Sequence, residues 1–255
     1  MLALVACCLP RQALPIVMRD DVPEQRFIEL AKKYPAAVSV RPATGWGAEG
    51  TLIAPRWVLT AAHVAAGIGP GGFVEAGGKS YPIEQVFVHP EFHEMKMADL
   101  PYDIGLIRLK LPVPGIEPAL LFNGREQVHS IVTFVGRGAS GTGLTGPERE
   151  NRQARAATNR LDRVEGAFLQ FRFDGPADAG ITALEGISGP GDSGGAAFQD
   201  IDGKLYVIGV SSWQDARPTG RKQGLYGVIE NYVRVAQHYE WLVRTMNVGP
   251  AVSTR

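Results

Sequence analysis

Apolar residues follow two spacings along the chain, one typical of helices and one typical of short strands. Residues 24–34 and 233–246 each carry four apolar side chains three or four positions apart, which predicts an amphipathic helix near each end. Between these segments the apolar runs are short and are separated by turn residues, as in a series of antiparallel strands. The predicted strands are residues 36–40, 50–53, 57–59, 79–88, 105–109, 130–135, 167–173, 195–198, 205–211 and 224–228.

The composition supports an all-β fold and excludes some functions. Of 255 residues 45% are hydrophobic, and 31 glycines and 18 prolines supply the turns that a β-barrel or β-sandwich needs. The formal net charge is zero, so charge gives no reason to expect a nucleic-acid partner. No apolar run approaches the roughly 18 to 20 residues that span a bilayer. We therefore expect a globular protein with no transmembrane segment and no nucleic acid as partner.

A glycine-flanked serine at residues 191–195 (Gly-Asp-Ser-Gly-Gly) has two upstream partners of the kind that its chemistry requires. A serine hydroxyl is a weak nucleophile near neutral pH, so Ser193 needs an adjacent base, and the imidazole of His63 can accept and return a proton. A carboxylate such as that of Asp103 holds the imidazole in the tautomer that presents its acceptor nitrogen to the serine. The order His, Asp, Ser predicts a catalytic triad and a serine hydrolase.

The serine loop also offers backbone donors for the charge that develops on a substrate carbonyl oxygen. The N–H groups of Gly191 and Ser193 are the candidates for this oxyanion hole. Each such donor is worth about 3–4 kcal/mol of transition-state stabilisation. Proline has no N–H, so a proline at either donor position would remove a donor. Pro190 stands one residue before Gly191, so both predicted donors are present.

Several segments outside the triad resemble the trypsin/chymotrypsin family of serine endopeptidases. Residues 57–63 (Trp-Val-Leu-Thr-Ala-Ala-His) look like the strand that leads into the family's histidine turn, and residues 209–213 look like its substrate-pairing strand. Residues 135–138 are similar to the family's Gly-Trp-Gly segment, with Arg137 in place of tryptophan. Residues 239–242 look like part of its C-terminal helix.

This resemblance, which covers about residues 36–245, implies the fold. It implies an all-β chain of two six-stranded antiparallel β-barrels packed together, followed by a C-terminal α-helix, with the site between the barrels. The predicted parts are a signal- or pro-like segment at 1–15, a first barrel with His63 and Asp103 at 16–122, a second barrel with Ser193 at 123–232, and the helix with a tail at 233–255.

Cysteine usage departs from that of many family members. The only two cysteines are Cys7 and Cys8. Ala48 and Val64 stand where many relatives carry a disulfide beside the histidine turn, and Gly189 replaces a half-cystine beside the nucleophile. A missing disulfide typically removes about 2–4 kcal/mol, which a domain of this size can supply from its core. The chain is thus similar to a cysteine-poor, bacterial-type branch.

The resemblance also implies where substrate specificity is set. The family residue six positions before the serine lies at the base of the specificity pocket, and here it is Ile187. A guanidinium buried against isoleucine would be costly, so we expect small or medium apolar side chains before the scissile bond rather than basic ones. Ser212 and Trp213 would bind substrate, and Gln214 would narrow the entrance. If the loop register is shifted by two, Glu185 is the alternative base of the pocket.

The family pattern further implies an activation step. In the family the aspartate before the nucleophile, here Asp192, is held by a newly formed α-amino group. Ile16 and Val17 resemble the Ile-Val start of mature members, although Pro15 precedes them and no basic cleavage point adjoins. We hypothesise that processing near Ile16 matures the enzyme.

The first residues bear on location. Residues 1–6 are apolar but shorter than the roughly 7 to 15 residue core of a secretion signal, and they lack a basic start. Residues 4–7 resemble a bacterial lipoprotein cleavage box, which predicts a lipid anchor at Cys7. Alternatively, this segment is an N-terminal tag without function. Export to the periplasm, to the cell exterior or to a lipid anchor is the family-level expectation.

Two other groups of polar residues have simpler interpretations. His89 and His93 are four positions apart, but Pro90 argues against a continuous helix and no third ligand is evident, so we predict no metal site. Arginines between residues 149 and 163 alternate with acidic residues, which favours a solvated loop and strand face over an anion site.

The function that the sequence predicts is a serine endopeptidase that acts through an acyl-enzyme. It would need no cofactor, take a polypeptide as substrate and act as a monomer. A non-catalytic binding protein on a protease fold is the alternative, because a fold does not guarantee its chemistry.

Overall fold

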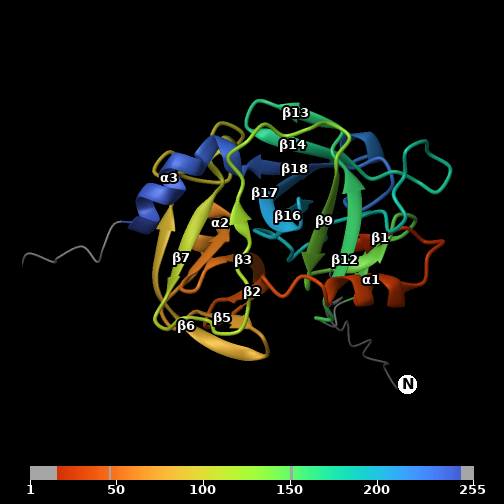
Figure 1. The fold of residues 1–255 in the computed structure, drawn as a ribbon. Coiled ribbons are helices and arrows are strands. Elements are labelled where there is room, and N and C mark those ends of the chain that lie inside the picture. The colour runs from red at the N-terminus through yellow and green to blue at the C-terminus, as the bar shows by residue number, and fades with distance from the viewer. Residues whose placement is uncertain (1–15, 46, 150–151, 248–255) are drawn as a thin grey trace, which may run out of the picture.

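Six strands close the first half of the chain into a barrel (Figure 1). The computed structural model describes residues 16–45, 47–149 and 152–247. Aliphatic side chains such as Val38, Val58 and Ile107 fill the barrel, because alternate residues of each strand point inward. In order around the barrel the strands are β2 (Ala37–Arg41), β3 (Ala48–Ala54), β4 (Trp57–Thr60), β7 (Gly105–Leu109), β6 (Lys79–Val88) and β5 (Phe73–Ala76).

The second half forms an eight-stranded sheet whose hydrogen-bonded ladder does not close. Its core is aromatic: the ring of Phe134 lies 4.8 Å from that of Tyr232 and 5.0 Å from that of Phe171. Seven strands run in the order β12 (Arg155–Arg160), β9 (Ile131–Gly136), β16 (Ala196–Ile201), β17 (Lys204–Asp215), β18 (Ile229–Arg234), β14 (Phe168–Arg172) and β13 (Arg163–Glu165), and β8 (Leu120–Leu121) pairs with β17.

A smaller sheet ties the start of the described chain to the second half. Its order is β11 (Gly146–Arg149), β10 (Ser140–Thr142), β1 (Val17–Met18) and β15 (Gly186–Ile187). The pairing of β1 with β15 is antiparallel, and it holds Val17 opposite Ile187. Residue 16 therefore lies beside the segment that leads to the glycine-flanked serine.

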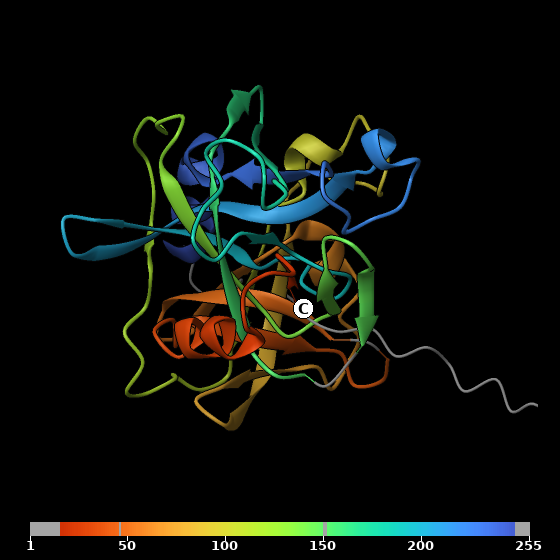
Figure 2. The ribbon, with the colours of Figure 1, turned by 90° about the vertical axis from the view of Figure 1, so that its right-hand side faces the viewer.

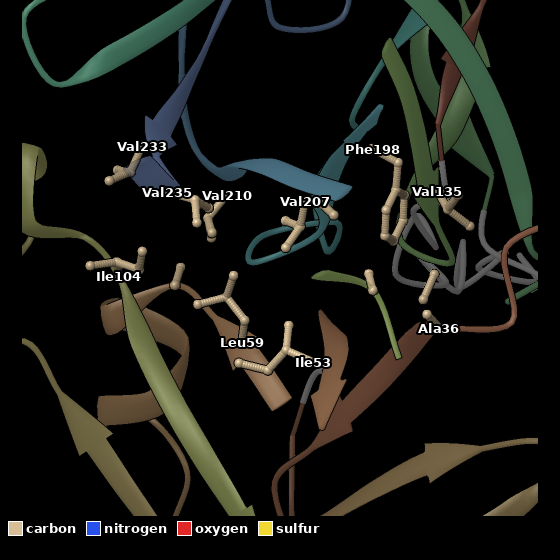
Figure 3. Packing of buried hydrophobic residues seen from close by; sticks show 14 of the residues in the cluster. Ala36, Ile53, Leu59, Ile104, Val135, Phe198, Val207, Val210, Val233 and Val235 are labelled. Carbon is tan, nitrogen blue, oxygen red and sulfur yellow. The ribbon is translucent and has the colours of Figure 1, made fainter. Parts of the chain in front are cut away.

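The two halves share an apolar core (Figure 3). Ile53 and Leu59 of the first barrel face Val207 and Val210 of the second half across this interface, and all four side chains are buried. Because burial of an apolar side chain stabilises by about 1.5–3 kcal/mol, this interface fixes how the two halves sit against each other.

The helices cover the ends of the sheets. They are α1 (Glu24–Ala31), α2 (Ala62–Ala66), α3 (Val235–Asn247) and the 3₁₀ turns η1 (Leu100–Tyr102) and η2 (Arg217–Thr219). Figure 2 shows α1 at the lower side of the molecule, where the buried Arg155 of β12 donates a 2.7 Å hydrogen bond from Nε to Glu24. In α3, His238 Nε2 lies 2.9 Å from the carbonyl oxygen of Pro101. No helix in the described ranges is both long and apolar enough to cross a membrane.

The predicted fold class is confirmed, with three differences in detail. The second half is an open eight-stranded sheet rather than a closed barrel of six strands. The strand predicted at residues 224–228 is wrong, since the strand is β18, five residues later. Arg155, interpreted as part of a solvated face, is buried because Glu24 pairs with it.

The predicted first barrel, residues 16–122, also includes two strands that hydrogen-bond to the second half of the chain. β1 and β8 lie inside the predicted first barrel, yet both pair with strands of the second half. The predicted segment 1–15, including Cys7, lies outside the described residues.

Candidate active site

His63 and Asp103 come together at one end of the first barrel. His63 is the second residue of α2, which directly follows β4, and Asp103 lies between η1 and β7, the strand paired with β4. The ring Nδ1 of His63 lies 2.8 Å from Oδ2 of Asp103, and the backbone N–H of His63 donates to Oδ1 at 2.9 Å. Asp103 is fully buried. The carboxylate thus fixes both the backbone and the ring of the histidine, and ring Nε2 is left for another partner.

Ser212 brings the second half to this carboxylate. Its hydroxyl donates a 2.6 Å hydrogen bond to Oδ2 of Asp103. The register between β17 and β18 shifts between Ser211 and Trp213, so Ser212 sits at a β-bulge. Bulges turn a side chain out of the regular strand alternation, which here directs the hydroxyl toward the other barrel. Sequence reasoning assigned Ser212 to substrate binding and missed this contact.

The loop that carries Ser193 packs against β3 and against residues 60–61, which lead into α2 and His63. The carbonyl oxygen of Ser193 accepts a 2.9 Å hydrogen bond from the N–H of Glu49 in β3. Gly194 has a φ of +80°, and a Cβ placed there would lie 2.2 Å from Oγ1 of Thr60 and 2.9 Å from the nitrogen of Ala61. Only glycine allows such an approach. The serine predicted as nucleophile therefore lies on a loop packed directly beside the turn that precedes His63.

The predicted oxyanion donors are the backbone N–H groups of Gly191 and Ser193. Among the described residues, neither the N–H of Gly191 nor that of Ser193 donates a hydrogen bond. Gly191 has a φ of +96°, and a Cβ there would meet Cα of Gly138 at 2.9 Å. Backbone N–H groups that a loop holds in a fixed position, free to bind a ligand, are the usual donors to an oxyanion.

Asp192 points away from solvent and anchors this loop. Its Oδ1 accepts from the N–H of Gly138 at 2.7 Å, and its Oδ2 accepts from Gly189 at 2.8 Å and from the backbone nitrogen of Ile16 at 2.9 Å. Burial raises the pKa of Asp192, and these hydrogen bonds oppose that rise. The predicted pairing of Ile16 with Asp192 is therefore present as a contact of the backbone nitrogen.

A small hollow opens beside Ser193 under β17. Its volume is about 90 Å³. The side-chain Nε2 of Gln214 donates to the carbonyl oxygen of Ser188 at 2.7 Å, so an amide bridges two walls of the hollow. The lining residues are Ser188, Gly189, Pro190, Ser193, Ser211, Ser212, Trp213, Gln214, Gln223 and Glu230.

Glu230 is the lining residue that sequence reasoning missed. It stands opposite Gln214 in the β17–β18 ladder and is buried. Its Oε2 accepts from the N–H of Ser188 at 2.7 Å, and its Oε1 accepts from the Ser188 hydroxyl. Burial raises the pKa of Glu230 to about 7, although the Ser188 hydrogen bonds act in the opposite direction. An acid within a strand that pairs with the predicted substrate-binding strand was the available signal.

The two residues proposed from sequence as the base of the pocket do not line this hollow. Ile187 is fully buried in a cluster with Val17, Phe173 and Val228. Because successive strand residues point to opposite sides, its neighbour Ser188 faces the hollow instead. Glu185 is also buried and accepts hydrogen bonds from the N–H and hydroxyl of Thr182, at 2.8 and 2.6 Å. The predicted contact of Ile187 with a substrate side chain is therefore not supported by its position.

Two packed β-halves, with a histidine–aspartate pair on one and a glycine-flanked serine loop on the other, define a chymotrypsin-like serine protease fold. The sequence model of the family described as Trypsin matches residues 28–242. The chain belongs to the trypsin family.

Individual relatives agree with this assignment. Over 238 residues the chain is 30% identical to complement C1s subcomponent of Sus scrofa, which covers 81% of this chain and 33% of that protein. It is 28% identical to trypsin of Saccharopolyspora erythraea, over 78% of this chain and 87% of that protein. The chain spans about a third of the length of complement C1s.

The fold is also that of a solved protease. Neuropsin, a serine protease expressed in the limbic system of mouse brain, superimposes with a TM-score of 0.65 at 21% identity, covering 90% of this chain and 99% of the other. At this identity the likeness concerns the fold.

Proposed function

We propose that the protein is a serine endopeptidase in which Ser193, His63 and Asp103 form the catalytic triad. The hydroxyl of Ser193 attacks the substrate carbonyl while Nε2 of His63 takes its proton. The resulting imidazolium gives that proton to the leaving amine, and an acyl-enzyme remains. Water then attacks the acyl carbonyl while His63 takes a proton from it, the bond between this carbon and Oγ of Ser193 breaks, and His63 returns the proton to Oγ as the acid product leaves. The observation that carries the proposal is the pair of hydrogen bonds from His63 to Asp103, beside the Ser193 loop.

The unpartnered N–H groups of Gly191 and Ser193 are proposed to hold the oxyanion of the tetrahedral intermediate. Asp192 lies between these two residues, and it positions their N–H groups indirectly because its carboxyl group accepts three backbone hydrogen bonds that fix the loop. We also propose that cleavage before Ile16 turns its nitrogen into an ammonium group. A buried carboxylate is stabilised far more by a cation than by a neutral amide.

Substrate residues before the scissile bond are proposed to pair with β17. The ladder between β16 and β17 ends at Val210, so residues 212–214 pair with β18 on one side only, and on the side of β16 they have no strand partner in the described part of the chain. An extended peptide adds to such an edge through main-chain hydrogen bonds. The side chain next to the scissile bond enters the hollow of about 90 Å³, which favours small side chains such as alanine or serine.

The Gln214 bridge supports the proposal that basic side chains are disfavoured at this position. A lysine or arginine would have to break the 2.7 Å hydrogen bond between Gln214 and Ser188 before it reached Glu230. The predicted exclusion of basic residues thus stays, while its proposed cause moves from Ile187 to Gln214.

An activity-based label tests the proposal. A fluorophosphonate should modify the processed protein at Ser193, and Ser193→Ala should abolish labelling while the exposed Ser80→Ala, a matched control, should not. Peptide hydrolysis should be lost in the same variant. A folded, processed protein that resists the label would instead support a binding module.

Location is proposed on the sequence alone. We propose that the protein is exported, with a lipid on Cys7 as the anchor. Incorporation of radiolabelled palmitate, lost in Cys7→Ser, tests the anchor, and fractionation of cells tests export.

A further inference from the structure

A second hollow, rich in arginine, borders the oxyanion loop. Its volume is about 310 Å³. It ends at Gly191, one of the two proposed oxyanion donors, and shares no lining residue with the small hollow under β17. Its lining residues are Arg41, Gly45, Gly47, Arg137, Gly138, Arg152 and Gly191.

The chain segment 40–42 places this arginine hollow on the side from which the leaving amine departs. Val40 and Pro42 line an apolar hollow of about 180 Å³ that also contains His63. Under the proposed function, His63 hands a proton to the leaving amine, so substrate residues after the scissile bond pass next to it. Arg41 stands between Val40 and Pro42 and lines the neighbouring arginine hollow. A peptide leaving His63 along this segment therefore reaches the arginines next.

Two of the arginines share one carboxylate. Oε2 of Glu75 accepts from Nε of Arg41 at 3.0 Å and from Nη2 of Arg152 at 2.9 Å. Glu75 does not itself line the arginine hollow, and 40% of its side chain is exposed. One negative charge thus faces two positive charges, and solvent weakens its hold on both.

The third arginine has a carboxyl partner of its own. Nη1 of Arg137 donates to Oε2 of Glu49 at 2.8 Å, and Nη2 donates to the carbonyl oxygen of Ala37 at 3.2 Å. Burial raises the pKa of Glu49, and Arg137 opposes the rise. Among the described residues, the three arginines of this hollow are paired with only two carboxyl groups, those of Glu49 and Glu75. The arginine hollow therefore keeps a net positive charge.

The positive charge continues outward from the arginine hollow. A larger hollow of about 500 Å³ shares Arg41, Arg137 and Arg152 with it and adds Lys79 and Lys32, of which Lys32 is paired with Glu29 at 2.7 Å. Glu75 is the acidic residue of its lining. Five cations along this path face three carboxylates, those of Glu29, Glu49 and Glu75, so the path keeps an excess of positive charge that favours an acidic ligand.

We propose that these arginines form a subsite for acidic side chains that follow the scissile bond, so that the enzyme prefers peptides carrying glutamate or aspartate there. The inference rests on the proposed function for the direction of the peptide. The inference concerns substrate residues after the scissile bond, whereas the hollow under β17 concerns the residue before it.

Matched peptides test this preference directly. Three peptides share the same sequence through alanine at the scissile bond and carry Glu-Glu, Gln-Gln or Lys-Lys at the second and third positions after it. We expect kcat/KM to be about 5- to 10-fold higher for Glu-Glu than for Gln-Gln, since each partly exposed ion pair contributes modestly. The Lys-Lys peptide should be poorest, and 0.5 M NaCl should shrink the differences. Equal rates for the three peptides would overturn the subsite.

Variants assign the effect to the arginines. The double variant Arg41→Gln/Arg152→Gln should bring the Glu-Glu to Gln-Gln ratio to about 1 or below, because Glu75 then stands uncompensated. Glu75→Gln should raise the ratio. Arg163→Gln, an exposed arginine paired with Glu165, is the matched control and should keep the ratio of the parent protein. A ratio unchanged in the double variant would overturn the proposal.

Binding to Ser193→Ala separates this subsite from catalysis. Fluorescence anisotropy of the labelled peptides on this variant should show the same order of affinities, Glu-Glu before Gln-Gln before Lys-Lys. Ordered binding without hydrolysis by the parent protein would refute the peptidase but retain the acidic subsite. Hydrolysis by the parent protein, with no such order in binding or in rate, would support the peptidase but refute the acidic subsite.

Discussion

The two halves of the molecule bury different kinds of groups. The first barrel is filled by aliphatic side chains, and its buried Asp103 is paired with a histidine. The second half has an aromatic core and holds most of the carboxyl groups whose pKa burial raises. In the second half these are Asp174, Glu185, Asp192 and Glu230, and Glu49 is the corresponding residue of the first barrel.

The partners of these carboxyl groups explain why the halves differ in role. Asp192, Glu185 and Glu230 are held by backbone N–H groups, hydroxyls and an amide rather than by arginine or lysine. Neutral donors stabilise a buried carboxylate less than a cation does. The half with Ser193 is therefore the one whose buried carboxyl groups are more sensitive to protonation, and under the proposed function it is also the half that processing before Ile16 completes.

The strongest test of this division removes one chemical group from each half. Ser193→Ala should lower kcat for peptide hydrolysis by about 10⁶-fold, because the nucleophile is lost. Asp103→Asn should lower it by about 10⁴-fold, since an amide favours the wrong tautomer of His63. Steady-state kinetics on one alanine peptide measures both. If Asp103→Asn kept kcat within tenfold of the parent, Asp103 would not orient the base.

The next test concerns processing in the second half. A cleavage site for a specific protease placed directly before Ile16 should allow activity to rise by about 10²-fold or more on cleavage, as the oxyanion donors become fixed. The new ammonium group should lower the raised pKa of Asp192, because it replaces a neutral partner. Asp192→Asn should remove the gain. Full activity before cleavage would show that the amide of Ile16 is sufficient.

The third test opens the hollow beside Ser193. Gln214→Gly removes the bridge to Ser188, so lysine or arginine before the scissile bond can reach Glu230. Cleavage after lysine relative to alanine should rise by about 10-fold. Adding Glu230→Gln should cancel the gain, since the carboxylate is lost. Competition between a lysine peptide and an alanine peptide in one reaction measures the ratio of the two cleavage rates. An unchanged ratio in Gln214→Gly would show that Glu230 does not contact the substrate side chain.

The smallest expected effect is on stability. Burial raises the pKa of Glu185 to about 7, above its unfolded value, so its contribution is complete below the unfolded pKa and is lost as pH rises toward 7. Glu185→Gln should reduce the loss of unfolding free energy between pH 6 and pH 7 by about 1 kcal/mol. Urea denaturation at both pH values measures this. The exposed Glu165→Gln is the control, and an equal effect in both variants would contradict the assignment.

The same contrast explains which predictions from sequence succeeded. The strands predicted at residues 79–88 and 105–109 coincide with β6 and β7, because the apolar pattern of a barrel is local. In the second half β18 was misplaced by five residues, since Glu230 and Asn231 interrupt its apolar run. The buried Arg155 was taken for a surface residue, because its partner Glu24 is distant in sequence.

The site shows a similar limit. Spacing and residue type predicted that His63 and Asp103 would meet, and the structure places them 2.8 Å apart. The base of the hollow could not be predicted from position alone, because β15 turns Ile187 toward Val17 and presents Ser188 instead. The Glu49–Arg137 pair joins two halves of the chain, so no local pattern indicates it.

The contact between His238 and Pro101 has a consequence for synthesis of the chain. A ribosome completes α3 only after every segment that the helix touches, including the η1 turn directly before Asp103. A nascent chain that has already released His63, Asp103 and Ser193 still lacks this contact behind Asp103. Translation order thereby leaves the turn before Asp103 without its helical support until the last described helix has emerged.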